Sequence, residues 1–220
     1  MFLVFDLDGT LIDGYDGITD ALGFAMERLG RKAIPVSQVR GMVGEGLERL
    51  LEKAVGRDLV ADGVRLFRER YAQIADEKTS LMPDVPTVLA TLAAGGHAMS
   101  VASNKPAEFS RRILQGKGIA SRFVAIVGPE PGVPPKPHPE MLERLMRAAG
   151  ASPGGTVAVG DMEIDSEFAR SAGCRVVLVS GGSRSEAELA RVDADARLSR
   201  LAELPAWIES LPRIAASRIG

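Results

Sequence analysis

The first thirteen residues, MFLVFDLDGTLID, constrain the fold more than any other stretch of the chain. Residues 2–5 form a short apolar run, which is typical of a strand buried on both faces. Asp6 and Asp8 follow it directly, and alternate side chains of an extended chain share a face. In open α/β sheets, ligands bind where such strands end. The stretch therefore predicts a buried strand with an acidic ligand site at its carboxyl end.

The paired carboxylates indicate a bound cation. Neighbouring carboxylates repel each other unless a cation or a shared proton lies between them, and Mg²⁺ prefers oxygen ligands. Gly9 allows a sharp exit from the strand and exposes backbone N–H groups that can hold an anion. The same pattern occurs in helix caps and turns, but the apolar strand before it and Gly9-Thr10 after it favour a ligand site.

Composition narrows the class of protein. With 220 residues, the chain can form one large domain or a core with an insertion, and its net charge of −2 gives no electrostatic case for nucleic acid or an acidic membrane. Cys174 is the single cysteine, so we expect a buried, inert thiol. The first apolar run stops at Asp6, and no later run is long enough to cross a bilayer. We expect a cytoplasmic protein, a monomer or a homodimer, that acts on a small molecule.

Periodicity divides the chain into two kinds of structure. Helical patterns cover about residues 15–29, 47–55 and 60–78, and no stretch between Asp16 and Lys78 resembles a strand. From Pro83 onward, strands alternate with helices, which predicts a doubly wound, Rossmann-like parallel sheet. We therefore expect an α/β core of residues 1–15 and 80–220 with an inserted all-helical cap domain of residues 16–79. The expected strands are residues 98–102, 123–127, 157–159, 175–179 and a short segment at 196–198; the expected helices are 85–94, 103–116, 139–149, 164–172, 186–192 and 201–211.

Polar side chains follow several of the expected strands. Ser103 and Asn104 come after residues 98–102, Lys136 lies in the loop after the next strand, and Asp161 and Asp165 follow residues 157–159. Each alone has a structural explanation, since Ser, Asn and Asp commonly cap helices and a lysine is usually solvated. Together they predict a site with carboxylates, a hydroxyl and a lysine at one edge of the sheet.

These residues lie in motifs that resemble those of the haloacid dehalogenase-like hydrolases, specifically their phosphatases with a helical cap. The resemblance covers nearly the whole chain, and Ser103 stands where the family more often has threonine. The cap stretch Val43-Gly44-Glu45-Gly46 is most similar to the phosphoglycolate phosphatase branch. The four matching motifs are Asp6-Leu7-Asp8-Gly9-Thr10-Leu11, Ser103-Asn104-Lys105-Pro106, Lys136-Pro137-His138-Pro139 and Gly160-Asp161-Met162-Glu163-Ile164-Asp165.

The resemblance implies a mechanism through a phosphorylated aspartate. Asp6 would be the nucleophile, and Asp8 would protonate the leaving alcohol and later deprotonate water. Mg²⁺ would be held by the Asp6 side chain, the Asp8 backbone carbonyl and Asp161. An acid at the Asp8 position makes dehalogenation a poor match.

The resemblance also implies how the phosphate is held. Ser103 and Lys136 would contact the phosphoryl oxygens, and Asp165 would orient Lys136 or a metal-bound water. Thr10 favours the phosphatase pattern, because mutase relatives often carry valine there. Backbone N–H groups would come from residues near Leu7, Asp8 and Asn104.

The expected substrate is a small phosphorylated metabolite such as 2-phosphoglycolate. Sugar phosphates, nucleotides and pyrophosphate are alternatives, as are a phosphosugar mutase or a catalytically idle binding protein on the same fold. We expect Gly44-Glu45-Gly46 to face the phosphate, with a plain interhelical turn as the alternative. Arg40 is the nearest cap candidate for binding a substrate carboxylate. We expect no catalytic role for His97 or His138.

Overall fold

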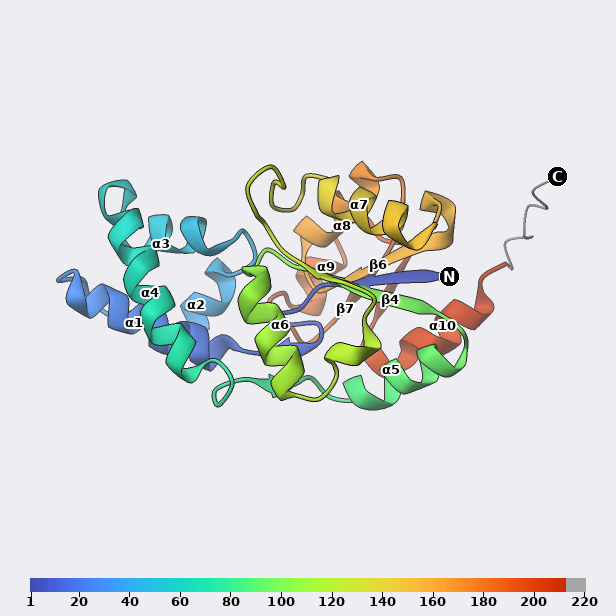
Figure 1. Ribbon diagram of the computed structural model, residues 1–220, viewed down its shortest axis with the longest axis horizontal. Coiled ribbons are helices and arrows are strands. Elements are labelled where there is room, and N and C mark those ends of the chain that lie inside the picture. The colour runs from blue at the N-terminus through green and yellow to red at the C-terminus, as the bar shows by residue number, and fades with distance from the viewer. Residues whose placement is uncertain (213–220) are drawn as a thin grey trace.

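A six-stranded parallel sheet, in the order β5-β4-β1-β6-β7-β8, forms the centre of the computed structural model, which describes residues 1–212. The expected core extends to residue 220, so its last eight residues lie outside the described part. The sheet and its surrounding helices confirm the predicted doubly wound α/β class (Figure 1). The strands of this sheet are β1 (Phe2–Phe5), β4 (Ala98–Ala102), β5 (Ile126–Val127), β6 (Thr156–Gly160), β7 (Arg175–Val179) and β8 (Ala196–Leu198).

Strand β1 is central because it is apolar on both faces. It pairs in parallel with β4 and β6, so that Phe5 lies opposite Val101 and Val159. Leu3 and Phe5 belong to one buried cluster, whereas the alternate residues Phe2 and Val4 belong to another. Because successive side chains of a strand point to opposite faces, these clusters are the two layers of core on either side of the sheet.

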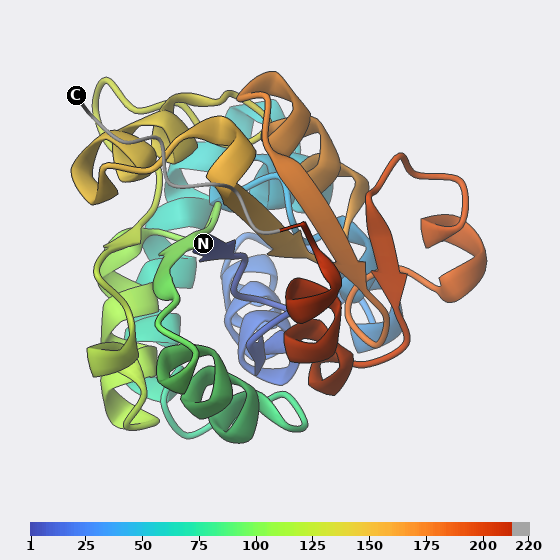
Figure 2. The same ribbon diagram turned by 90° about the vertical axis from the view of Figure 1, so that its right-hand side faces the viewer.

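Helices cover both faces of the sheet (Figure 2). Residues of α5, α6 and α10 pack in the cluster of Phe5, and residues of α7, α8 and α9 pack in the cluster of Phe2. The helices are α1 (Tyr15–Arg28), α2 (Val36–Met42), α3 (Leu47–Val55), α4 (Val60–Ile74), α5 (Val85–Ala94), α6 (Ala107–Gly116), α7 (Glu140–Ala149), α8 (Glu163–Ser171), α9 (Glu186–Leu189) and α10 (Leu204–Ser210), with short 3₁₀ turns at Arg57–Leu59, Ala120–Arg122, Pro153–Gly155 and Leu201–Glu203.

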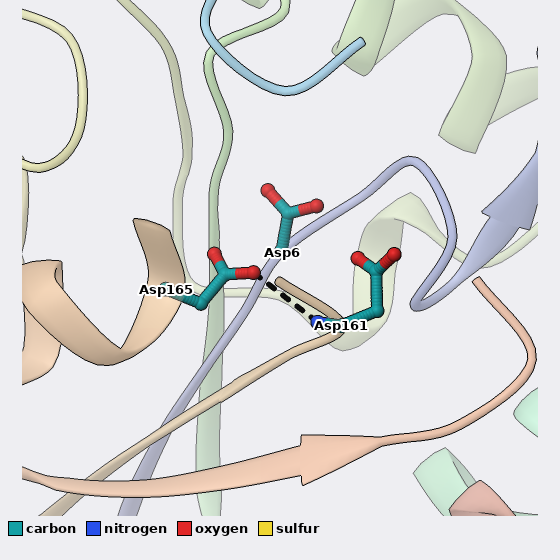
Figure 3. Close-up of side chains that lie close together, drawn as sticks. All are labelled: Asp6, Asp161 and Asp165. Carbon is teal, nitrogen blue, oxygen red and sulfur yellow. Dashed lines mark hydrogen bonds between the residues drawn. The ribbon is translucent and has the colours of Figure 1, made fainter. Parts of the chain in front are cut away.

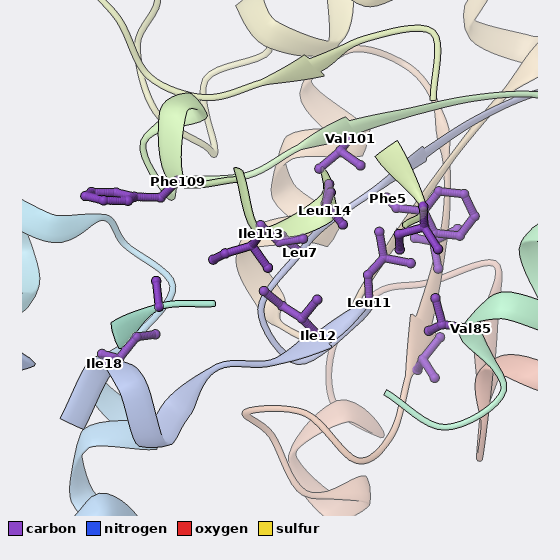
Figure 4. Close-up of a cluster of buried hydrophobic side chains, with 14 of the residues drawn as sticks. Phe5, Leu7, Leu11, Ile12, Ile18, Val85, Val101, Phe109, Ile113 and Leu114 are labelled. Carbon is purple, nitrogen blue, oxygen red and sulfur yellow. The ribbon is translucent and has the colours of Figure 1, made fainter. Parts of the chain in front are cut away.

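Helices α1 to α4 lie together at one end of the molecule (Figure 1). The chain enters them after β2 (Ile12–Asp13) and leaves them before β3 (Ser80–Leu81), and these two short strands pair with each other in antiparallel. Buried apolar side chains continue from Phe5 on the sheet to Ile18 on α1 and Phe109 on α6 (Figure 4). The helical group is therefore joined to the sheet by a narrow two-strand connection and an apolar contact.

Several element boundaries differ from the sequence-based expectation. The helix expected over residues 60–78 ends at Ile74, the one expected from Ser103 begins at Ala107, and the strand expected over 123–127 is only Ile126–Val127. Helix α2 was not expected, because Val39 is its one buried residue and a single apolar position has no periodicity. Cys174 is buried and unpaired, as expected. Across residues 1–212, no helix has the length and apolar character needed to cross a membrane.

Candidate active site

Three neighbouring strands end at the same edge of the sheet and carry polar residues there. Asp6 directly follows β1, Ser103 follows β4 and Asp161 follows β6. The parallel register places Phe5 beside Val101 and Val159, so these strand ends lie level with one another. A cavity opens between this edge and the helices α1, α3 and α4. The polar residues that line it from the sheet side are Asp6, Asp8, Ser103, Asn104, Lys105, Lys136 and Asp165.

Three carboxylates meet at this edge. Oxygens of Asp6, Asp161 and Asp165 all lie within 4.8 Å of one another (Figure 3). Burial raises the pKa of Asp161 well above its ordinary value, and the charges of Asp165 and Asp6 raise it further. Oxygen ligands of this kind and spacing suit a hard divalent cation, which would remove their repulsion. The arrangement fits the metal that the sequence indicates.

Asp161 accepts two hydrogen bonds, and two glycines leave room for its carboxylate. Its carboxylate accepts hydrogen bonds from Thr10 Oγ1 at 3.3 Å and from the Ser183 backbone N–H at 2.5 Å. A Cβ at Gly9 or at Gly182 would lie 2.4 Å or 2.1 Å from Asp161 Oδ2, respectively, so both positions need glycine. Sequence reasoning missed Ser183, although it follows β7 and thus lies at a further strand end. Its hydroxyl lies 2.5 Å from the Tyr15 hydroxyl.

Asp165 is bound more fully than the other two carboxylates. Its Oδ2 accepts backbone N–H groups of Asp161 and Met162, each at 3.2 Å, and its Oδ1 accepts Lys136 Nζ at 2.8 Å. Burial raises the pKa of Asp165 to about 6, and the positive charge of Lys136 opposes that shift. These three hydrogen bonds occupy both oxygens of Asp165.

Lys136 is a buried cation at the centre of the acidic cluster. Its Nζ donates to Asp6 Oδ1 and to Asp165 Oδ1, each at 2.8 Å. Burial lowers its pKa, but Asp165 and Asp6 outweigh that effect and keep the amine charged. Asn104 fixes the lysine, because its Oδ1 accepts the Lys136 backbone N–H at 2.7 Å.

A second buried lysine contacts Asp8. Lys105 Nζ donates to Asp8 Oδ2 at 2.7 Å and lies 4.9 Å from the centroid of the Tyr71 ring. Sequence reasoning quoted Lys105 as part of a motif but assigned it no role. Its position directly after Ser103-Asn104 was the available signal. Asp8 Oδ1 is buried and has no hydrogen-bond partner among the described residues.

The cap stretch reaches the site through backbone. The Gly44 carbonyl accepts a hydrogen bond from Asn104 Nδ2 at 2.9 Å. Gly44 has φ +121°, and a Cβ there would lie 2.5 Å from Met162 Sδ. Gly44 and Gly46 line the cavity, whereas Glu45 is exposed and pairs with Lys53.

Arg40 and the two histidines lie away from the cavity. Arg40 pairs with Asp13 at 3.4 Å and covers the face of the Tyr15 ring at 4.0 Å. His97 Nδ1 lies 3.2 Å from the N-terminal amine, and His138 Nδ1 accepts the Glu140 backbone N–H at 3.2 Å. None of the three is among the residues that line the cavity.

Comparison with known proteins gives the same assignment at the level of family. The model of the haloacid dehalogenase-like hydrolases matches residues 3–179. A phosphoglycolate phosphatase of Yersinia pseudotuberculosis is 34% identical over 209 residues, covering 92% of this chain and 90% of that protein. One from Vibrio parahaemolyticus is 35% identical over 182 residues, covering 78% of this chain and 80% of that protein.

Solved structures share the fold over nearly the full length. A predicted phosphoglycolate phosphatase from Haemophilus somnus superimposes with a TM-score of 0.85 at 26% identity, covering 94% of this chain and 97% of that one. A predicted phosphatase from Clostridium acetobutylicum gives a TM-score of 0.88 at 23% identity, covering 96% and 98%.

Proposed function

We propose that this chain, which belongs to the haloacid dehalogenase-like hydrolases and is a phosphatase, hydrolyses 2-phosphoglycolate through a phosphorylated Asp6. The observation that carries the proposal is the grouping of Asp6, Asp8 and Lys136 around one cavity at the carboxyl edge of the sheet. The names of relatives about one-third identical support the choice of substrate.

The reaction proceeds in two displacements. A carboxylate oxygen of Asp6 attacks phosphorus and forms an O–P bond while the ester P–O bond breaks. Asp8 gives its proton to the leaving oxygen. Water then attacks the phosphorus of the aspartyl-phosphate and passes a proton to Asp8, which releases inorganic phosphate and restores Asp6. Asp8 thus gives up a proton in the first displacement and takes one back in the second.

The transferred phosphoryl group needs donors on its free oxygens. The Ser103 hydroxyl, the Lys136 amine and backbone N–H groups supply them at the strand ends. Lys136 Nζ also lies 2.8 Å from Asp6 Oδ1, so its charge acts on both nucleophile and phosphate. The backbone donors are those near Leu7, Asp8 and Asn104.

Magnesium is the cation we assign to the acidic cluster. The Asp6 and Asp161 carboxylates and the Asp8 backbone carbonyl would hold it, and it would supply positive charge that lets a carboxylate approach a phosphate dianion. The support is the set of closely spaced carboxylate oxygens. Asp165 is assigned the role of orienting Lys136 and the turn at Asp161, because it pairs with the Lys136 amine and also accepts the backbone N–H groups of Asp161 and Met162.

We assign residues 16–79 to a cap over a core of residues 1–15 and 80–220. The short pairing of Ile12–Asp13 with Ser80–Leu81 is the two-strand connection between them. Rotation about that connection would open the cavity to substrate and close it against water.

The direct test is phosphate release from a panel of substrates. The purified protein is given 2-phosphoglycolate, glucose 6-phosphate, AMP and pyrophosphate, with MgCl₂ or with EDTA. We expect kcat/KM to be highest for 2-phosphoglycolate and activity to vanish in EDTA and return with Mg²⁺. A higher kcat/KM for another member of the panel would contradict the substrate, and full activity in EDTA would contradict the metal.

A further inference from the structure

Two positively charged side chains line the cavity. Among the described residues that line it, Lys105 and Lys136 are the only ones with a positive charge. Lys136 is already held between Asp6 and Asp165 beside the position of the phosphoryl group. Lys105 is therefore the lining cation that is left to meet a negative charge on the rest of the substrate.

Lys105 is held between Asp8 at the sheet edge and Tyr71 on α4. Its side chain is 7% exposed, and its Nζ donates to Asp8 Oδ2 at 2.7 Å. The Tyr71 ring on α4 lies against it, 4.9 Å from the amine. A buried amine held in this way loses little conformational entropy when it binds an anion.

We propose that Lys105 binds the carboxylate of the substrate's leaving group and thereby selects short phosphorylated acids. The inference rests on the proposed function, since it uses Asp8 as the general acid. A general acid lies about 3 Å from the oxygen that it protonates. Lys105 contacts the same Asp8 carboxylate, so a substrate carboxylate one carbon from the ester oxygen is within its reach.

The cap wall of the cavity supports this assignment. Apart from glycines and the Tyr71 hydroxyl, it is made of apolar side chains, so most hydroxyl groups of a sugar leaving group would be buried without hydrogen-bond partners. Arg40, the cap cation that sequence reasoning favoured, pairs with Asp13 outside the cavity. The cap wall thus disfavours leaving groups that carry hydroxyl groups, and Lys105 attracts a leaving group that carries a carboxylate. The residues of the cap wall are Ile18, Val43, Leu47, Leu50, Phe67 and Tyr71.

The test compares two substrates that share a two-carbon skeleton. In both 2-phosphoglycolate and ethyl phosphate, the ester oxygen carries two carbons. The second carbon is a carboxylate in the former and a methyl group in the latter. The readout is the ratio of their kcat/KM values, because any effect of Lys105 through Asp8 acts on both substrates. We expect Lys105→Met to lower this ratio by about 10- to 100-fold, the value of a lost charge-assisted contact, and Lys105→Arg to restore part of it.

Two further variants separate the alternatives. Lys53→Met removes a lysine that pairs with Glu45 outside the cavity, so the ratio should stay at the wild-type value. Arg40→Met tests the rival cation and should also leave the ratio unchanged. An unchanged ratio in Lys105→Met, or an equal fall in Arg40→Met, would overturn the inference.

Melting curves show whether each variant folds. If a variant does not fold, the ratio of kcat/KM values in the wild-type protein still tests the inference. A wild-type ratio of about one would overturn the inference while leaving the phosphatase intact. Absence of Mg²⁺-dependent hydrolysis of both substrates would overturn the proposed function itself. A ratio well above about ten in the wild type that falls in Lys105→Met supports both.

Discussion

At the scale of single residues, Asp8 has an environment unlike that of the other carboxylates at the site. It lies beside the cluster of Asp6, Asp161 and Asp165 but pairs with its own lysine, Lys105, at 2.7 Å. Its second oxygen is buried without a partner among residues 1–212. A carboxyl group that is free on one side can exchange a proton with a leaving group, which is the role we give it.

The Asp8→Asn variant tests this role through its dependence on the leaving group. The amide cannot protonate an alkoxide, so kcat/KM for 2-phosphoglycolate should fall by about 10³-fold or more. The loss should be much smaller for p-nitrophenyl phosphate, whose leaving group needs no proton. Steady-state kcat/KM is the appropriate measure because it reports the first displacement. Equal losses on the two substrates would contradict a general acid at Asp8.

Most of the candidate site could be predicted because its residues follow apolar strands. Asp6, Ser103 and Asp161 each come directly after such a run, and parallel strands bring their carboxyl ends together. Lys105 could not be predicted in the same way, because the turn between β4 and α6 decides whether its side chain faces Asp8 or solvent. The expectation for Arg40 had the same weakness: proximity in sequence to Gly44 did not reveal its partner Asp13.

At the scale of elements, the turn between α2 and α3 connects the helical group to the sheet. Gly44 accepts a hydrogen bond from Asn104 and packs against Met162, so this turn closes one side of the cavity. The close approach of this turn to Met162 depends on glycine at position 44, since φ there is +121° and a Cβ would overlap the Met162 sulfur.

The Gly44→Ala variant should therefore push the turn away from the sheet. We expect kcat/KM for 2-phosphoglycolate to fall by about tenfold, with a smaller loss on an aryl phosphate that depends less on a closed cavity. Gly41→Ala is the matched control, because a Cβ at that position on α2 meets no atom within 4 Å. If the two variants have the same activity as each other, the contact of this turn with the sheet has no role in catalysis.

Element types could be predicted more securely than element ends. Long amphipathic helices such as α1 and α3, and apolar strands such as β4 and β7, match the expected positions. The strands β2 and β3 have two residues each, too few for any alternation to show. Their pairing depends on contacts between residues about seventy positions apart, and no local pattern reports such contacts.

At the scale of the whole molecule, the acidic cluster links metal binding to stability. Burial raises the pKa of Asp165 to about 6 and that of Asp161 well above its ordinary value. A folded-state pKa above the unfolded value means that the folded chain binds more protons in that window, so the contribution of these groups to stability decreases as the pH rises through it. Mg²⁺ bound at this cluster, as we propose, would compete with those protons.

Melting temperatures with and without Mg²⁺ test this linkage. At about pH 8, Mg²⁺ at about 100 times its Kd should raise Tm by about 5–10 °C. The increment should shrink as the pH falls, because the raised pKa of Asp161 lets protons compete with the cation for this ligand. Asp161→Asn should abolish the increment at every pH. An increment that is independent of pH, or that survives in Asp161→Asn, would place the cation elsewhere.

The central claim is that Asp6 forms the covalent bond to phosphorus, and turnover of the Asp6→Asn variant on 2-phosphoglycolate tests it most directly. The amide nearly matches the carboxylate in shape and relieves the repulsion within the acidic cluster, so the melting temperature should be close to that of the wild type. The account predicts that kcat falls by about 10⁴-fold or more in this folded variant. A kcat within about tenfold of the wild type would contradict a nucleophilic Asp6.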